Sequence, residues 1–348
     1  MESNHFNYFR VKNFKRFRDL EVKDIGQFNL VLGDNNVGKT SLLEALLYPN
    51  SHNIEWFISN LFKCLEFRNF PNPKREFWRY YLPTESYYER VSEEIEIYHG
   101  KMDESIFHVS IGANRMYIRP NSYKLHEYGD NFLDDTLEAS EGRDIDYHAV
   151  ESFSSKEIPL IPFQGSFSSE IAEFYLNFMQ GNKDLKKRFI KGMNRLFSEI
   201  EDIELSLLEE NQKTLLVSRA DSNYSVPLAF YGEGTIKLTK VLSYLVRHGD
   251  KHVLIDEIDT GLYYQRMKDF WKVILETAFD NNTQIFATTH NQECIKAYQE
   301  ALEELGDDYL SKARTITLKE HPETKDVIAY TNTIDVLQFA SEMGNDIR

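Results

Sequence analysis

The sequence predicts an α/β fold built around a mixed sheet, and three patterns in its 348 residues indicate this. An apolar run at 28–32, FNLVL, is followed by a glycine and then by a helical pattern at 39–47, KTSLLEALL. Further apolar runs at 253–255 and 283–290 are typical of strands that are covered on both faces. Residues 50–150 instead contain strand-like fragments separated by turns, which favours an antiparallel meander beside that sheet.

The amino-terminal part, residues 6–32, reads as short strands. The alternation in YFRVKNF predicts a half-buried strand. The stretch RVKNFKRFR is basic, and its charged side chains belong to Arg10, Lys12, Lys15, Arg16 and Arg18. This stretch is either the solvated face of an edge strand and turn or a local contact for nucleic acid.

Residues 33–40, GDNNVGKT, have the spacing G-x-x-x-x-G-K-T of a phosphate-binding loop between a strand and a helix. Backbone N–H groups at the amino terminus of that helix favour anions. Lys39 is expected to reach the β and γ phosphates, and the Thr40 hydroxyl to bind Mg²⁺. The sequence thus predicts ATP and Mg²⁺ as cofactors, held by Asn35, Asn36, Val37, Gly38, Lys39, Thr40 and Ser41.

The middle of the chain differs in character. Fragments EEIEIYHG, IFHVSIG and RMYIRP predict meander strands with turns at 99–100 and 112–114, and residues 126–150 predict an acidic, mobile loop. Apolar spacing from 168 to 200 predicts two helices separated at Gly181 and Asn182. We therefore expect an inserted lobe at 50–204, between the two parts of a core at 1–49 and 205–348.

A second half of the site is expected near the carboxyl terminus. Val253, Leu254 and Ile255 are followed directly by Asp256 and Glu257. The carboxyl edge of an α/β sheet is where ligands bind. Asp256 is expected to hold Mg²⁺, and Glu257 to orient and deprotonate the attacking water.

Two further motifs accompany this pair. His290 ends the next apolar run and could contact a γ-phosphate, although a lone histidine is more often structural. Gly232, Glu233 and Gly234 open a helical pattern that continues from 236 to 245. A helix that begins in this way is a second anion site, which makes sense if it serves the nucleotide of a partner subunit.

As an ordered set, these motifs resemble the ABC-type ATPases of the RecF/SMC/OLD-like group, commonly classed with the AAA ATPases. FRVKNFKRFRDLEVKDIGQFNLVLGDNNVGKTSLLEAL resembles that group's first block, YGEGTIKL its signature, LIDEIDTGL its Walker B motif and D-loop, and QIFATTHNQECIKAY its His-switch block. The resemblance implies an ABC-type P-loop head with a mixed sheet, an antiparallel meander and a helical lobe. It also implies that two heads dimerise over two ATP molecules, with the D-loop at 259–262 in the interface.

The chain departs from the family pattern in several places. Phe230 stands where the signature often has a serine, and Tyr263 stands where a histidine often follows the D-loop. Gln164 is a candidate for the Q-loop. No long heptad region is present, and no Asp-x-Asp follows residue 290, so we expect no TOPRIM nuclease in this polypeptide.

Composition limits the remaining possibilities. The formal net charge of −16 argues against a free-standing DNA binder, which is usually basic. Cys64 and Cys294 form no C-x-x-C pair, and no signal peptide or membrane-spanning run is evident, which predicts a cytoplasmic protein without a membrane partner.

The function expected from these observations is a Mg²⁺-dependent ATPase switch that forms a homodimer or a higher homo-oligomer. It would control a separately encoded effector, such as a nuclease or a toxin, in anti-phage defence or DNA repair. Two alternatives remain open: a non-hydrolysing ATP-binding scaffold, for which Phe230 argues, and a stand-alone DNA repair ATPase of RecF type that binds nucleic acid.

Overall fold

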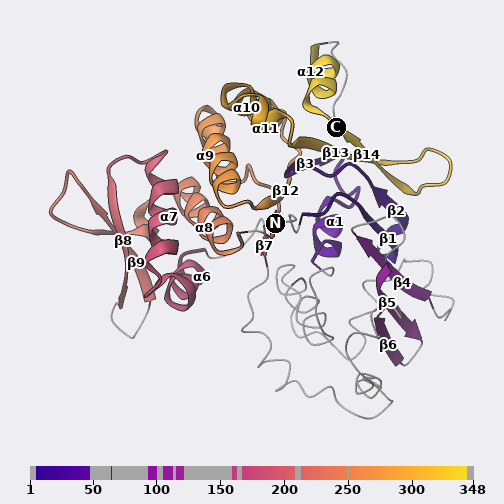
Figure 1. The fold of residues 1–348 in the computed structure, drawn as a ribbon, viewed down its shortest axis with the longest axis horizontal. Coiled ribbons are helices and arrows are strands. Elements are labelled where there is room, and N and C mark those ends of the chain that lie inside the picture. The colour runs from indigo at the N-terminus through magenta and orange to yellow at the C-terminus, as the bar shows by residue number, and fades with distance from the viewer. Residues whose placement is uncertain are drawn as a thin grey trace.

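The computed structural model describes residues 5–47, 64, 93–99, 105–112, 115–120, 159–162, 167–207, 213–249 and 251–342. The predicted loop at 126–150, Gln164 and parts of the predicted turns lie outside these residues. Within the ranges just given, no helix is long and apolar enough to cross a membrane. The fold is of the predicted mixed α/β class (Figure 1).

A six-stranded mixed sheet forms the centre, in the order β14-β13-β3-β12-β11-β7. Its strands are β3 (Phe28–Gly33), β7 (Leu160–Ile161), β11 (His252–Ile255), β12 (Gln284–Thr288), β13 (Ala313–Glu320) and β14 (Val327–Asn332). Only the β13–β14 pairing is antiparallel. Every residue of β3, β11 and β12 is buried, which confirms strands covered on both faces.

Alternate residues of these strands enter two separate hydrophobic cores. Leu30 and Leu32 belong to the core that contains the apolar faces of the larger helices, whereas Val31 belongs to the core around α1 and the first strands. The helices are α1 (Lys39–Ala45), α8 (Glu233–Arg247), α9 (Met267–Asp280), α10 (Gln292–Leu305), α11 (Asp307–Leu310) and α12 (Ile334–Glu342). Figure 1 shows α8, α9 and α10 on one side of β3 and β12, with α1 on the other.

The predicted meander is present and joins the amino-terminal strands. It comprises β4 (Glu93–His99), β5 (Ser105–Gly112) and β6 (Arg115–Pro120), which follow β1 (Phe9–Phe14) and β2 (Phe17–Val22) in the chain. The sheet order is β2-β1-β4-β5-β6, and all of its pairings are antiparallel. Because β4 pairs with β1, a strand from the middle of the chain completes a sheet begun at residue 9.

The helical lobe contains α6 (Phe167–Phe174), a π-helical turn (Tyr175–Met179) and α7 (Lys183–Asn194). The predicted break is confirmed, since Gly181 has a φ of +84° and the Asn182 side chain caps α7 by accepting from the Leu185 N–H. A small antiparallel sheet of β8 (Ile200–Leu207), β9 (Lys213–Arg219) and β10 (Val226–Pro227) packs beside these helices. This sheet is not predicted from the sequence, because an irregular register between Ile200 and Asp202 interrupts the alternation of β8.

Candidate functional site

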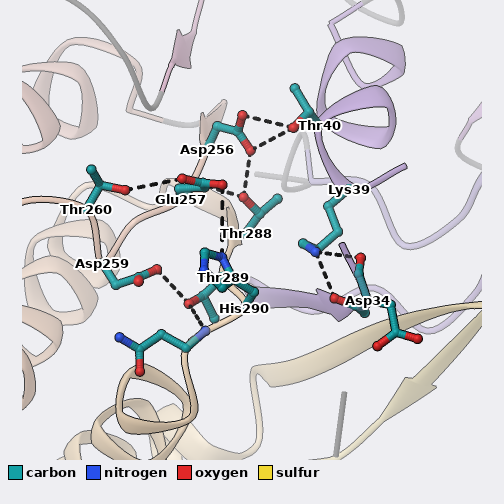
Figure 2. A network of polar contacts seen from close by, with 12 residues as sticks. Asp34, Lys39, Thr40, Asp256, Glu257, Asp259, Thr260, Thr288, Thr289 and His290 are labelled. Atoms are coloured by element: carbon teal, nitrogen blue, oxygen red, sulfur yellow. Dashed lines mark hydrogen bonds and ion pairs between the residues drawn. The ribbon is translucent and has the colours of Figure 1, made fainter. Parts of the chain in front are cut away.

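Three neighbouring parallel strands bring the distant motifs together at their carboxyl ends. β12 lies between β3 and β11, and it pairs with both of them. The phosphate-binding loop follows β3, Asp256 and Glu257 follow β11, and His290 lies just beyond β12. Figure 2 shows the labelled residues of these segments facing a common space.

The phosphate-binding loop has a backbone that depends on left-handed conformations. Gly33 and Gly38 have φ values of +143° and +113°, and Asn36 has a φ of +64°. A Cβ on Gly38 would lie 2.8 Å from the Phe17 ring, so the close approach of this ring also requires glycine. Gly38 is the N-cap of α1, and its carbonyl accepts from the Leu42 N–H. The loop therefore turns directly into the helix, which aims the first N–H groups of α1 outward.

The basic residues before the loop are used within the fold. The Arg16 guanidinium donates to the Asn36 carbonyl in the loop, and its other arm pairs with Glu320 at 2.7 Å. Arg10 forms a two-pronged pair with Asp19, which includes a contact of 2.6 Å. These contacts favour a structural interpretation of the 10–18 stretch over a nucleic-acid contact.

Lys39 lies folded against the loop. Its Nζ donates to the carbonyls of Gly33 at 2.7 Å and Asp34 at 2.9 Å. Burial lowers the pKa of Lys39, while the carboxylates of Asp256 and Glu257 act in the opposite direction. The ammonium is therefore held at the mouth of the site, where a phosphate oxygen could replace a carbonyl as acceptor.

The side-chain oxygens of Thr40 and Asp256 lie next to one another. The Thr40 hydroxyl donates to both carboxylate oxygens of Asp256, at 3.0 and 3.2 Å. Asp256 is 3% exposed, and its burial raises the pKa of the carboxyl group although the hydrogen bonds from Thr288 and Thr40 oppose this. A buried carboxylate beside a hydroxyl suits Mg²⁺, which prefers oxygen ligands and would compensate this burial.

Glu257 projects in a different direction from its neighbour. Its φ of +43° is left-handed, and its N–H donates to the Thr288 hydroxyl at 2.8 Å. One carboxylate oxygen lies 4.0 Å from His290 Nδ1, and the other accepts from the Thr260 hydroxyl at 3.4 Å. Asp256 thus points inward at Thr40, while the Glu257 carboxylate faces the half-exposed His290 (Figure 2).

The residues of the predicted signature motif lie at the start of α8. Gly232 is the N-cap of α8, and the helix begins at Glu233. A Cβ on Gly234 would have Leu262 Cδ2 at 3.1 Å and the Gly261 carbonyl oxygen at 3.4 Å as its nearest neighbours. The motif therefore lies against the D-loop of its own chain. Phe230 and Tyr263, the two departures from the family pattern, are 80% and 60% exposed.

Two threonines are missing from the residues singled out in the sequence. The Thr288 hydroxyl donates to Asp256 at 2.7 Å while it accepts from the Glu257 N–H, and the Thr289 hydroxyl donates to Asp259 at 2.6 Å. The available signal was the pair of hydroxyl residues directly before His290 in TQIFATTH. Polar residues that end a buried strand next to an acidic strand end are candidates for such contacts.

The comparisons agree with this architecture. A solved SMC head, bound to the C-winged helix domain of ScpA, has a TM-score of 0.55 and 12% identity, over 96% of this chain and 99% of that one. An "ATP/GTP phosphatase" of Helicobacter pylori (strain ATCC 700392 / 26695) is 23% identical over 345 residues, which is 89% of this chain and 91% of the relative.

The fold resembles that of an SMC head, and the site has the arrangement of a P-loop ATPase of the AAA class. Residues 28–295, most of the chain, match the family described as "AAA domain, putative AbiEii toxin, Type IV TA system". The chain belongs to that family.

Proposed function

We propose that this chain binds ATP with Mg²⁺ and hydrolyses the anhydride bond between its β and γ phosphates, which gives ADP and phosphate, with Glu257 as the base that activates water. The observation that carries this proposal is the convergence of Lys39, Thr40, Asp256 and Glu257 at the carboxyl ends of β3 and β11, the two parallel strands that flank β12. Such a site contributes positioning and charge stabilisation, which are most of what phosphoryl transfer requires.

Each residue has a defined task. N–H groups of residues 34–40 and the Lys39 ammonium bind the phosphates. Thr40 and Asp256 would hold Mg²⁺, which would supply positive charge to offset the charge on the transferred group. Glu257 takes the proton of the attacking water, and His290, 4.0 Å from its carboxylate, is placed to contact the γ-phosphate.

The decisive experiment replaces the base and the phosphate ligand separately. Glu257→Gln keeps the size of the side chain but removes its basicity, so turnover should fall by about 10²–10⁴-fold while ATP binding persists. Lys39→Ala should weaken ATP binding itself. Steady-state hydrolysis and the affinity for a fluorescent ATP analogue measure the two effects.

Glu300→Gln on the exposed side of α10 is the matched control, because Glu300 pairs with Lys296 on the helix surface. It should leave both quantities unchanged. Normal turnover in Glu257→Gln would remove Glu257 from this role. Absence of turnover in the wild-type protein that still binds ATP would favour the non-hydrolysing scaffold, for which the exposed Phe230 remains the specific argument.

The second part of the proposal is that two copies sandwich the nucleotide. Gly232–Gly234 lie beside the D-loop rather than among the residues that contact Lys39, so they are available to a nucleotide on another copy. Phe230, just before the start of α8, and Tyr263, just after the D-loop, are both exposed. Large exposed aromatic side chains are typical of interfaces.

The third part concerns what the switch controls. We infer a separately encoded effector, a nuclease or a toxin, that acts in anti-phage defence or DNA repair. The family description names a toxin and a toxin–antitoxin system, which supports a role in defence rather than in repair. A head of this fold has been solved with a domain of another protein, ScpA. The net charge of −16 and the internal pairing of Arg10 and Arg16 argue against the stand-alone repair ATPase. We propose that the insert at 50–204 in a core of 1–49 and 205–348 supplies the docking surface.

A further inference from the structure

Lys237 is a buried lysine on α8, one helical turn after Gly234, and it is 2% exposed. Its Nζ donates to two backbone carbonyls, those of Glu257 at 2.6 Å and Thr260 at 3.1 Å. Burial lowers the pKa of Lys237 to about 8, whereas the carboxylates of Asp259, Glu257 and Asp256 favour the charged form. A buried ammonium is costly unless it is paired, so its placement on these carbonyls calls for a reason.

The two carbonyls belong to the turn that carries the proposed base. Glu257 has a left-handed backbone, and its carbonyl also accepts from the Thr260 N–H at 3.0 Å. Figure 2 shows Glu257 and Thr260 on this turn, with their side chains joined by a hydrogen bond. Lys237 therefore holds this turn through its backbone carbonyls and does not contact the Glu257 carboxylate, which faces His290.

The start of α8 also touches the far end of the turn. A Cβ on Gly261 would lie 3.3 Å from Glu233 Cβ, and a Cβ on Gly234 would lie 3.1 Å from Leu262 Cδ2. Neither position has room for a side chain without a shift of its neighbour. The start of α8 is thus in direct contact with residues 261 and 262, and Lys237 joins the helix to the carbonyls of Glu257 and Thr260.

We propose that Lys237 is a positioning residue for hydrolysis, which locks the Glu257–Thr260 turn to the first turn of the signature helix. When the start of α8 contacts the nucleotide of a second copy, any displacement of this helix end is then transmitted to the Glu257 backbone of the same chain. This inference rests on the proposed role of Glu257 as the base. It adds a link between the signature motif and the base inside one chain.

The test compares two substitutions at this position, Lys237→Met and Lys237→Arg. Lys237→Met keeps a long unbranched chain and removes both hydrogen bonds. The kcat for ATP should fall by about 10–100-fold, because a small displacement of a catalytic group has effects of this size. The affinity for the fluorescent ATP analogue should stay within about twofold of wild type, since no phosphate contact is lost. Lys237→Arg, which restores a cationic donor, should recover part of kcat.

Lys240→Met is the matched control. Lys240 is an equally buried lysine one turn further along α8, and it lines a small pocket with Ile171, Phe174, Ser243 and Tyr244. Its substitution should leave the kcat of the folded protein unchanged. If Lys237→Met does not fold, as judged by its melting temperature, Lys237→Gln takes its place and the same fall in kcat is expected.

A kcat within about twofold of wild type in folded Lys237→Met or Lys237→Gln would overturn the inference. A parallel loss of ATP affinity would overturn it too. Glu257→Gln, measured alongside, separates the two proposals. If Glu257→Gln retains turnover, the proposed function itself fails. If Glu257→Gln loses turnover and the Lys237 variants do not, only the role of Lys237 is wrong.

Discussion

At the scale of single residues, the Thr288 hydroxyl joins the two acidic residues of the site. It donates to Asp256 and accepts from the Glu257 N–H, so one oxygen holds the proposed metal ligand and the backbone of the proposed base. Thr288 is fully buried, and no solvent is at hand to replace either bond. The carboxylates of Asp256 and Glu257 are thereby held in different directions.

Thr288→Val keeps the shape of the side chain and removes this hydroxyl. The part-buried Glu257 N–H and the buried Asp256 carboxylate would each lose a partner, and such a loss typically costs about 1–3 kcal/mol in the free energy of unfolding. We also expect a lower kcat, because Glu257 would lose the bond that orients its backbone. Urea denaturation and steady-state hydrolysis measure the two effects.

Thr288→Ser keeps the hydroxyl and serves as the control, with activity close to wild type. Equal activity of the Val and Ser variants would contradict the bridging role of this oxygen.

At the scale of elements, α8 combines functional and structural duties along its length. Its amino terminus carries the signature motif, its middle buries Lys237 and Lys240, and His248 forms its C-cap. Burial lowers the pKa of His248 to about 3, and the neighbouring positive charges of Arg247 and Lys251 act in the same direction. The imidazole is therefore neutral in the folded protein at physiological pH, where it lies against Tyr244.

This shift predicts a pH dependence of stability. In the unfolded chain His248 takes up a proton below a pH of about 6.5, whereas the folded chain takes it up only near pH 3. The folded state therefore loses stability as pH falls from about 6.5 toward 3, by at most about 1.4 kcal/mol per pH unit from this group. Above a pH of about 6.5 His248 is neutral in both states, so it no longer makes the free energy of unfolding depend on pH.

His248→Phe retains the ring contact with Tyr244 and removes the titrating group. We expect its free energy of unfolding, measured with urea at pH 7.5 and 5.5, to change less between the two values than that of the wild type. An identical change in both proteins would show that His248 does not contribute to the acid sensitivity.

At the scale of the whole molecule, we propose that a complete site needs two copies of the chain. The phosphate-binding loop and the Asp256–Glu257 pair lie at the carboxyl ends of the parallel strands, while Gly234 lies beside residues 261 and 262. In the proposed dimer each surface completes the site of the other copy. Because bound nucleotide would contact both copies, it would stabilise the dimer relative to the monomer.

Nucleotide-dependent association is therefore the expected behaviour. Glu257→Gln with ATP and Mg²⁺ should have a larger mass by light scattering than the same protein without nucleotide, because hydrolysis no longer ends the sandwich. Lys39→Ala, which should bind ATP poorly, is the control and should show no change. A mass that is independent of nucleotide in wild type and Glu257→Gln alike would refute the sandwich.

A partner controlled by this switch should bind its two states unequally, since ATP can drive release or capture only through such a difference. We expect a protein to co-purify with the chain from its native host, and its retention to differ between Glu257→Gln and Lys39→Ala. Two results together would contradict this: no protein co-purifies with the chain, and the isolated chain itself cleaves or remodels DNA in an ATP-dependent way. The stand-alone repair ATPase would then be the better interpretation.

The sequence alone determined the elements whose signals are local. The run FNLVLGDNNVGKT contains its own strand, its left-handed glycines and the helix start, so β3, the loop and α1 could be predicted from residues that are neighbours in the chain. The same holds for the strand before Asp256 and for the break at Gly181. The division into a core and an inserted lobe remains a prediction.

Tertiary structure decided which of these pieces meet. Thr40 and Asp256 are 216 residues apart, and they meet because β3 and β11 run parallel in one sheet, on either side of β12. The pairing of β4 with β1, the hydroxyl of Thr288 between two acids and the reach of Lys237 to the Glu257 carbonyl depend on the same kind of information. Strand order and the direction of buried polar groups are set by packing among all elements at once, and no local pattern records that outcome.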